Sequence, residues 1–400
     1  MKGTDKRFAD AAFNAAENAC FDGSVIRIFD DKNIVLIPGF VDMHVHFRQP
    51  GFCYKETIKS GSLAAASAGY TTVCTMPNLS PAPDCAEHIE EQLKYINSDG
   101  VIGIIPYSCI TKGRCGISPV DFGEMIKYTR LFSDDGSGVQ STETVEQAMR
   151  KCAEYGGIYA AHCEVNELLL GGYIHDGQYA RTHGHRGISS ASEYVMIERD
   201  IELVRKTNCR YHVCHISTKE GVELVRRAKA DGLPVTCETA PHYLILCDDD
   251  LQEDGRFKMN PPLRSSSDRD ALINGIKDGT IDVIATDHAP HSKEEKSRGL
   301  EKSLMGITGL ETAFPILYTH LVKTGVISLE LLLKLMCYAP RQILGIPCRK
   351  DCFAVIDLDE KYTIDPESFI SMGKATPFES YEVFGKNLLT VYNGNTVWQI

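Results

Sequence analysis

One alternation repeats eight times through the middle of this 400-residue sequence. In each repeat a short segment rich in β-branched or aromatic residues precedes a longer amphipathic or polar segment, as in a strand followed by a helix. The predicted strands are residues 39–47, 70–76, 101–108, 130–133, 157–163, 210–216, 234–239 and 282–286. The predicted helices include residues 55–68, 86–97, 142–155, 191–206, 219–231 and 268–278. Eight such units predict an α/β fold, a (β/α)8 TIM barrel.

The two ends of the chain have a different sequence pattern from the predicted barrel. Strand-like pieces at residues 24–29 and 33–37 precede it, and similar short pieces run from about residue 353 to 400. We expect these flanking pieces to pair into one small sheet. The predicted division is residues 1–37 and 346–400 for a small β-rich accessory domain, and residues 38–345 for the barrel. A glycine- and histidine-rich segment at residues 171–190 predicts a surface excursion near the barrel mouth.

Charge and composition argue against several kinds of partner. The formal net charge is -12, so no broad basic surface is expected for nucleic acid or an anionic membrane. We find no run of about 18 apolar residues and no basic, apolar leader, which favours a cytoplasmic location. The 15 cysteines are scattered through apolar segments, a pattern typical of free, buried thiols in a reducing compartment.

Residues that can bind metal stand where the predicted strands end, which is where TIM barrels carry their active sites. His44 and His46 are two apart on one strand, so their imidazoles share a face and form a metal half-site. The other candidates are Asp134, Asp135, His162, His215 and Asp287. The same alternation predicts that Cys163 and Cys214 face away from the site. Imidazole and carboxylate ligands suit zinc, and less specifically manganese, iron or cobalt.

These candidates exceed what one tetrahedral ion needs, and a carboxylate can bridge two ions, so we predict a binuclear site. The predicted ligands are His44 and His46 for one ion, His162 and His215 for the other, Asp134 or Asp135 as the bridge, and Asp287 beside a shared hydroxide. Any single histidine could instead be a hydrogen-bonded core residue. Five such residues at four strand ends favour the metal site.

Several stretches of the sequence resemble the dihydroorotase branch of the amidohydrolase superfamily. They are residues 38–51, which include the Asp42-Met43-His44-Val45-His46 run, and residues 75–78, 259–264 and 285–291. The similarity extends from about residue 33 to the C-terminus. It implies a barrel, two Zn²⁺ ions and the reversible interconversion of L-dihydroorotate and N-carbamoyl-L-aspartate in pyrimidine biosynthesis.

The resemblance also implies which carboxylate bridges the ions. Many relatives use a carboxylated lysine at the end of strand four, but residues 132–138 contain no lysine. Asp135 matches the position of the bridging aspartate in one class of dihydroorotases. Asp134 stays possible, because a one-residue error in strand register would exchange the faces of the two side chains. Asp287 is then expected to act as general base and to pass a proton from the hydroxide to the departing amide nitrogen.

The substrate carboxylate of a dihydroorotase calls for a fixed cation. Arg48, two residues beyond His46, offers a bidentate guanidinium for it. By resemblance, Asn78, Asn260 and His291 also contact substrate, although each could be simple loop structure. The two glycines of residues 305–309 suit a mobile loop whose backbone touches the substrate.

Two alternative functions stay open from the sequence. A hydantoinase or allantoinase uses the same attack on a neutral cyclic ureide, and Arg48, Asn78 and the missing lysine argue against it. A catalytically silent dihydroorotase-like structural subunit is a second alternative, although every ligand position is filled. The family further implies a small-molecule substrate, no organic cofactor, a homodimer, and possible association with aspartate carbamoyltransferase.

Overall fold

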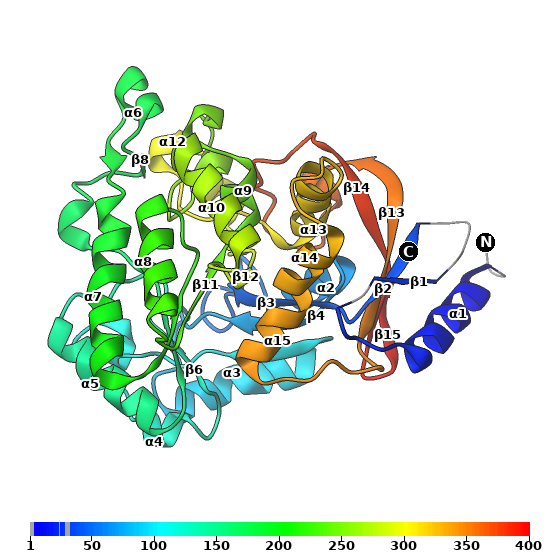
Figure 1. The fold of residues 1–400 in the computed structure, drawn as a ribbon, viewed down its shortest axis with the longest axis horizontal. Coiled ribbons are helices and arrows are strands. Elements are labelled where there is room, and N and C mark those ends of the chain that lie inside the picture. Colours follow the sequence, from blue (N-terminus) through cyan, green and yellow to red (C-terminus); the bar gives the residue numbers. More distant parts are fainter. Residues whose placement is uncertain (1–3, 24, 29–32) are drawn as a thin grey trace.

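The computed structural model describes residues 4–23, 25–28 and 33–400, and its largest part is a barrel of eight parallel strands (Figure 1). These strands are β3 (Phe40–Val45), β4 (Tyr70–Thr75), β5 (Gly103–Pro106), β6 (Leu131–Ser133), β7 (Ile158–Ala161), β10 (Arg210–Val213), β11 (Val235–Thr239) and β12 (Val283–Ile284). Pairing joins β3, β4 and β5 in one set and β6, β7, β10, β11 and β12 in another. Bridges from Ser108 to Phe132 and from Val45 to His288 close both seams. The predicted TIM barrel is confirmed.

Helices between the strands bury their apolar faces against the barrel wall. They are α2 (Ile58–Ser67), α3 (Ala86–Asp99), α4 (Phe122–Met125), α5 (Thr142–Glu154), α7 (Ala191–Thr207), α8 (Lys219–Ala230) and α10 (Ser266–Asp278). Capping side chains define several of their first turns, for example Thr57, which accepts a hydrogen bond from the Ser60 amide at the start of α2. Such caps satisfy amides that the helix leaves without a partner. Within the described ranges, no helix has the length and apolar content that crossing a bilayer requires.

Shorter elements decorate the loops at the barrel mouth and follow the last barrel strand. They are β8 (Ile174–His175), α6 (Gln178–His183), β9 (Gly187–Ile188), α9 (Pro241–Ile245), α11 (Lys293–Lys296), α12 (Gly299–Lys302), α13 (Ala313–Leu317), α14 (Leu329–Leu333) and α15 (Ala339–Leu344). The paired strands β8 and β9 and the helix α6 form the excursion predicted at residues 171–190. Single π-helical turns continue α13 and α14.

The two ends of the chain meet in one antiparallel sheet beside the barrel, as predicted. Its strand order is β1 (Ile26–Arg27), β2 (Ile34–Ile37), β13 (Phe353–Thr363), β14 (Glu382–Tyr392) and β15 (Asn395–Gln399). Asn387 and Thr390 of β14 donate side-chain hydrogen bonds to the Ala66 carbonyl of α2, which attaches the sheet to the barrel. Ser24 and Phe29, within the first predicted strand, lie outside the described residues. The exact boundaries between barrel and accessory domain stay a prediction.

A helix that the sequence analysis did not predict covers the outer face of this sheet. It is α1 (Thr4–Asn18), which Figure 1 shows farthest from the barrel. Ala12 and Ala16 of α1 are buried in one apolar cluster with Phe353 of β13 and Leu389 of β14. The N-terminal segment is therefore part helix and part strand, because a two-faced sheet beside a barrel needs a cover on its second face.

Candidate active site

The residues predicted as metal ligands gather at one end of the barrel, where the carboxyl ends of the strands open into loops. His44 belongs to β3, and the others follow a strand by one to three residues: His46 after β3, Asp135 after β6, His162 after β7, His215 after β10 and Asp287 after β12. All of these side chains are buried. The fold therefore brings together all six residues that the sequence predicts.

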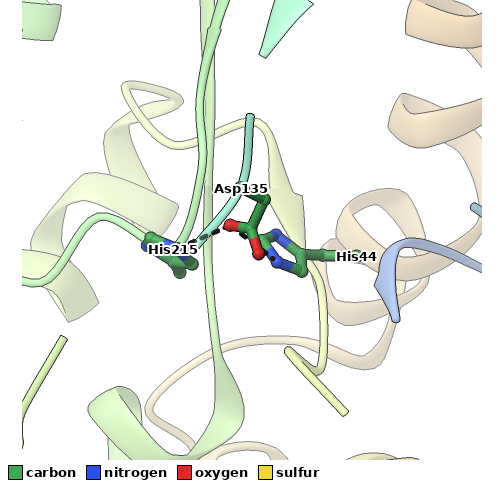
Figure 2. A group of neighbouring side chains, drawn as sticks. All are labelled: His44, Asp135 and His215. Atoms are coloured by element: carbon green, nitrogen blue, oxygen red, sulfur yellow. Dashed lines mark ion pairs between the residues drawn. The ribbon is translucent and has the colours of Figure 1, made fainter. Parts of the chain in front are cut away.

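The carboxylate of Asp135 stands at the centre of the histidines (Figure 2). Its Oδ1 atom lies 3.4 Å from Nε2 of His44, 3.4 Å from Nε2 of His215 and 3.6 Å from Nδ1 of His162. Its Oδ2 atom lies 3.5 Å from Nε2 of His46. Asp134 has no such surroundings, since its carboxylate accepts hydrogen bonds from Ile110 and Thr111. The geometry therefore favours Asp135 over Asp134 as the bridging carboxylate.

Asp287 faces the same centre from the end of β12, the strand next to β3. Its Oδ1 atom lies 3.2 Å from Nε2 of His46 and 3.5 Å from Nε2 of His44. His162 and His215 form the other half, with Nδ1 and Nε2 respectively 2.9 Å apart. Two groups of these side chains have ligand atoms within 4.8 Å of one another: His44, Asp135 and His215 form one, and His44, His46 and Asp287 form the other.

Left-handed backbone conformations aim some of these side chains. His215 has φ 34° and Asp287 has φ 48°, values that are uncommon outside glycine and often occur at functional sites. Cys214 lies two residues beyond the inward-facing His212, so regular alternation turns it into the barrel, where its Sγ lies near ligand atoms of His44 and Glu238. It is His215 that breaks the alternation, because its positive φ turns the imidazole inward as well. The prediction that Cys214 faces away is wrong for this reason. Burial raises the pKa of the Cys214 thiol to about 12.

Several buried polar atoms of the site lack hydrogen-bond partners among the residues that the structure describes. Nε2 of His44 and Oδ1 of Asp135 are both buried and have no hydrogen bond. Buried polar atoms are normally satisfied, so a pair of exceptions facing one another calls for a missing ligand. Imidazole nitrogens and carboxylate oxygens are the donors that Zn²⁺ and similar divalent ions prefer. The residues present thus fit a metal centre.

A pocket opens beside the histidines, and the predicted substrate-binding residues line it. These residues are Arg48, Asn78, Asn260 and His291, joined by Gly136, Ala289, Met305 and Gly306. Some already hold protein partners: Oδ1 of Asn78 lies 2.8 Å from Nδ1 of His46, and Nε2 of His291 lies 2.8 Å from the Met305 carbonyl. Met305 and Gly306 fall in the predicted glycine-containing loop.

Comparison with known proteins fits this geometry. Residues 33–221 match a family model described as Dihydro-orotase-like. A dihydroorotase of Fusobacterium nucleatum is 49% identical over 93% of this chain and 89% of its own length. Dihydroorotases of Bacillus cereus and Bacillus anthracis are 45% and 44% identical over 96% of this chain and 91% of theirs.

The chain belongs to the dihydroorotase family. Membership places it among the metal-dependent cyclic amidohydrolases, as its motifs predict. Similar solved structures come from other branches: an L-hydantoinase of Arthrobacter aurescens has a TM-score of 0.81 at 25% identity and covers 91% of this chain and 85% of that one. A D-hydantoinase with a TM-score of 0.79 at 21% identity, over 91% of this chain and 85% of that one, supports the fold alone.

The sequence analysis did not predict two carboxylates that lie beside the candidate metal ligands. Glu238 on β11 is fully buried, and its Oε1 lies 2.6 Å from Nδ1 of His44. Glu164 accepts a hydrogen bond of 2.9 Å from Asn260 and lies 3.8 Å from His162. The signal for Glu238 was present, because it is a charged residue that faces the barrel interior in an otherwise uncharged strand.

Proposed function

We propose that this protein is a dihydroorotase that interconverts L-dihydroorotate and N-carbamoyl-L-aspartate in pyrimidine biosynthesis. The observation that carries the proposal is Asp135, whose carboxylate lies within 3.6 Å of nitrogens from four histidines. The dihydroorotase family of the chain supports the same reaction. Hydrolysis opens the cyclic amide of dihydroorotate, and the synthetic direction closes it.

We further propose that the centre holds two Zn²⁺ ions. His44, His46 and Asp287 would hold one, His162 and His215 the other, with Asp135 between them. Two divalent ions held there would activate water and polarise the amide carbonyl of the substrate. The remaining tasks, which are orientation of the substrate and proton transfer, belong to the side chains.

Asp287 is the proposed general base. Its carboxylate faces both the histidines and the pocket, so a proton taken from the attacking water can pass to the amide nitrogen as the C–N bond breaks. In the synthetic direction the same carboxyl returns that proton to the departing water oxygen. A positioned carboxylate in this role contributes about 10²- to 10⁴-fold to the rate.

Arg48 is the proposed partner of the substrate carboxylate. It is buried, and its Nε makes a hydrogen bond of 3.4 Å to the Pro290 carbonyl. Among the residues that the structure describes, no carboxylate forms an ion pair with it. Burial lowers the pKa of Arg48 to about 10, so the guanidinium stays charged at neutral pH. A buried cation without a counterion favours an anionic ligand, which distinguishes dihydroorotate from a neutral hydantoin.

Asn260 and His291 are proposed to complete the substrate contacts, together with Asn78 and the backbone of residues 305–306. Nε2 of His291 faces the Met305 carbonyl as a donor, while its Nδ1 lies 3.1 Å from Oε2 of Glu295 and 3.3 Å from Nζ of Lys55. Burial lowers the pKa of His291 to about 3, so the ring is neutral. Its Nε2–H can reach a substrate oxygen only in place of the Met305 carbonyl.

We also propose a cytoplasmic setting for the protein. All 15 cysteines are free, which suits a reducing, cytoplasmic location. A homodimer and an association with aspartate carbamoyltransferase follow only from the habits of the family. Gel filtration with light scattering, alone and with that carbamoyltransferase, tests both.

Metal content and substrate preference, measured on the same preparation, test the proposal. We expect about two zinc ions per chain and dihydroorotate turnover that is lost on chelation and restored by zinc. Because hydantoinases share the fold, the panel includes hydantoin and allantoin. Faster turnover of either would reject the dihydroorotase assignment, and a metal-poor chain that stays inactive after zinc addition would identify a silent subunit.

A further inference from the structure

Glu238 contacts the ring nitrogen of His44 that faces away from Asp135. It lies on β11 with a fully buried side chain, and its Oε1 atom is 2.6 Å from Nδ1 of His44. We infer that Glu238 is a positioning residue, which fixes the tautomer and orientation of His44 for one of the two ions. The inference rests on the proposed two-ion site and deepens it.

The hydrogen-bond geometry determines which nitrogen of His44 is free. A carboxylate can only accept at 2.6 Å, so Nδ1 of His44 carries the hydrogen. In the neutral ring, Nε2 is then the nitrogen that carries the lone pair. It lies 3.4 Å from Oδ1 of Asp135 without a hydrogen bond. The opposite tautomer would place two acceptors against each other at Nδ1 and turn an N–H toward the ions.

A second histidine lies against the other oxygen of Glu238. Its Oε2 atom lies 3.2 Å from Nε2 of His212, whose Nδ1 is 2.8 Å from the Thr236 hydroxyl. Both neighbours come from barrel strands, His212 from β10 and Thr236 from β11. Hydrogen-bonded carboxylates of this kind orient metal-binding imidazoles and make them better ligands.

The other three histidines lack an equivalent partner. Nδ1 of His46 faces the neutral amide of Asn78 at 2.8 Å. Nε2 of His162 is 3.8 Å from the nearest oxygen of Glu164, and Nδ1 of His215 has no hydrogen bond. Loss of the Glu238 charge should therefore weaken the ion at His44 far more than the ion between His162 and His215.

Stepwise zinc affinities of the metal-free protein, measured by competition with a chromophoric chelator, test this selectivity. Glu238→Gln keeps the shape and one acceptor but removes the charge, and we expect one of the two affinities to fall by about 10- to 100-fold. The other affinity should change by less than about threefold. Asp200→Asn is the matched control, because Asp200 is equally buried but pairs with Arg199 and Tyr211. It should leave both affinities unchanged.

The outcomes separate this inference from the proposed function. A wild-type protein that binds no zinc would overturn the two-ion site itself. Suppose instead that the wild type binds two ions and that a folded Glu238→Gln protein shows unchanged or equally reduced affinities. That result would overturn only the role of Glu238. If that variant does not fold, ¹⁵N NMR of histidine-labelled, metal-free wild type decides, with His44→Gln to assign the signal. A hydrogen on Nδ1 of His44 supports the inference, and a ring that carries its hydrogen on Nε2 alone rejects it.

Discussion

Asp134 and Asp135 are neighbours in the chain, yet their carboxylates serve different surroundings. Oδ1 of Asp134 accepts hydrogen bonds of 2.8 Å from the Ile110 amide and 3.1 Å from the Thr111 amide, and Oδ2 accepts from the Thr111 hydroxyl. Asp135 instead faces four imidazoles. One residue of register thus separates a carboxylate that holds a loop from one that can join two ions.

Substitution of these two aspartates should therefore give opposite results. Asp135→Asn should lose most of its zinc and its dihydroorotate turnover, because an amide is a far weaker bridge than a carboxylate. Asp134→Asn should keep its zinc but lose about 1–3 kcal/mol of stability through weaker hydrogen bonds to the loop. Metal analysis and urea unfolding of both variants provide the measurement. Zinc retained by Asp135→Asn but lost from Asp134→Asn would reverse the assignment.

Asp287→Asn should separate proton transfer from metal binding. The amide cannot take a proton, so kcat should fall by about 10²- to 10⁴-fold. Zinc content should fall much less, since His44 and His46 remain. The measurement is kcat for dihydroorotate hydrolysis, with zinc content determined on the same samples. A variant that keeps full zinc and loses less than about tenfold in kcat would show that another group moves the proton.

Much of the barrel could be predicted because its signals are local. Strand and helix periodicity are properties of neighbouring residues, and all eight strands lie where the alternation places them. Helix α1 was missed for the opposite reason. An isolated helix of 15 residues is marginal in water. Its stability comes from packing of Ala12 and Ala16 on Phe353 and Leu389, which lie more than 300 residues away in the sequence.

The site residues show the same difference between local and long-range signals. The inward direction of His44 agrees with strand alternation, although the pairing of β3 with β4 shifts register between Asp42 and Val45. Alternation fails at His215, because its positive φ turns His215 inward beside Cys214, which obeys the alternation. The partnership of Glu238 with His44 spans 194 positions, and only the closed barrel brings the two together.

Glu311 should make the stability of the protein depend on pH. Its carboxyl accepts hydrogen bonds from the Ile370 and Ser371 amides, and burial raises its pKa from 4.5 to about 7. Between these values the folded state binds more protons than the unfolded state, so this group lowers the free energy of unfolding as pH rises. Glu311→Gln lacks that proton and should gain stability relative to wild type between pH 5 and 8, by up to about 3 kcal/mol. Urea unfolding of the metal-free proteins measures the difference, and one that does not vary with pH would contradict the shift.

Arg48 offers a test of substrate charge that leaves the metal ligands untouched. If its guanidinium binds the substrate carboxylate, Arg48→Met should lose a charge-assisted contact of about 1.5–3 kcal/mol, which is about 10- to 150-fold in kcat/KM. Arg48→Lys keeps the charge but not the paired donors, so its kcat/KM should lie between those of wild type and Arg48→Met. Zinc content of all three proteins serves as the control for an intact centre. A kcat/KM for dihydroorotate that changes by less than about threefold in Arg48→Met, with zinc retained, would mean that another group meets the carboxylate. A neutral cyclic ureide, as in a hydantoinase, would then be the better candidate substrate, because only this buried cation without an ion pair favours an anionic one.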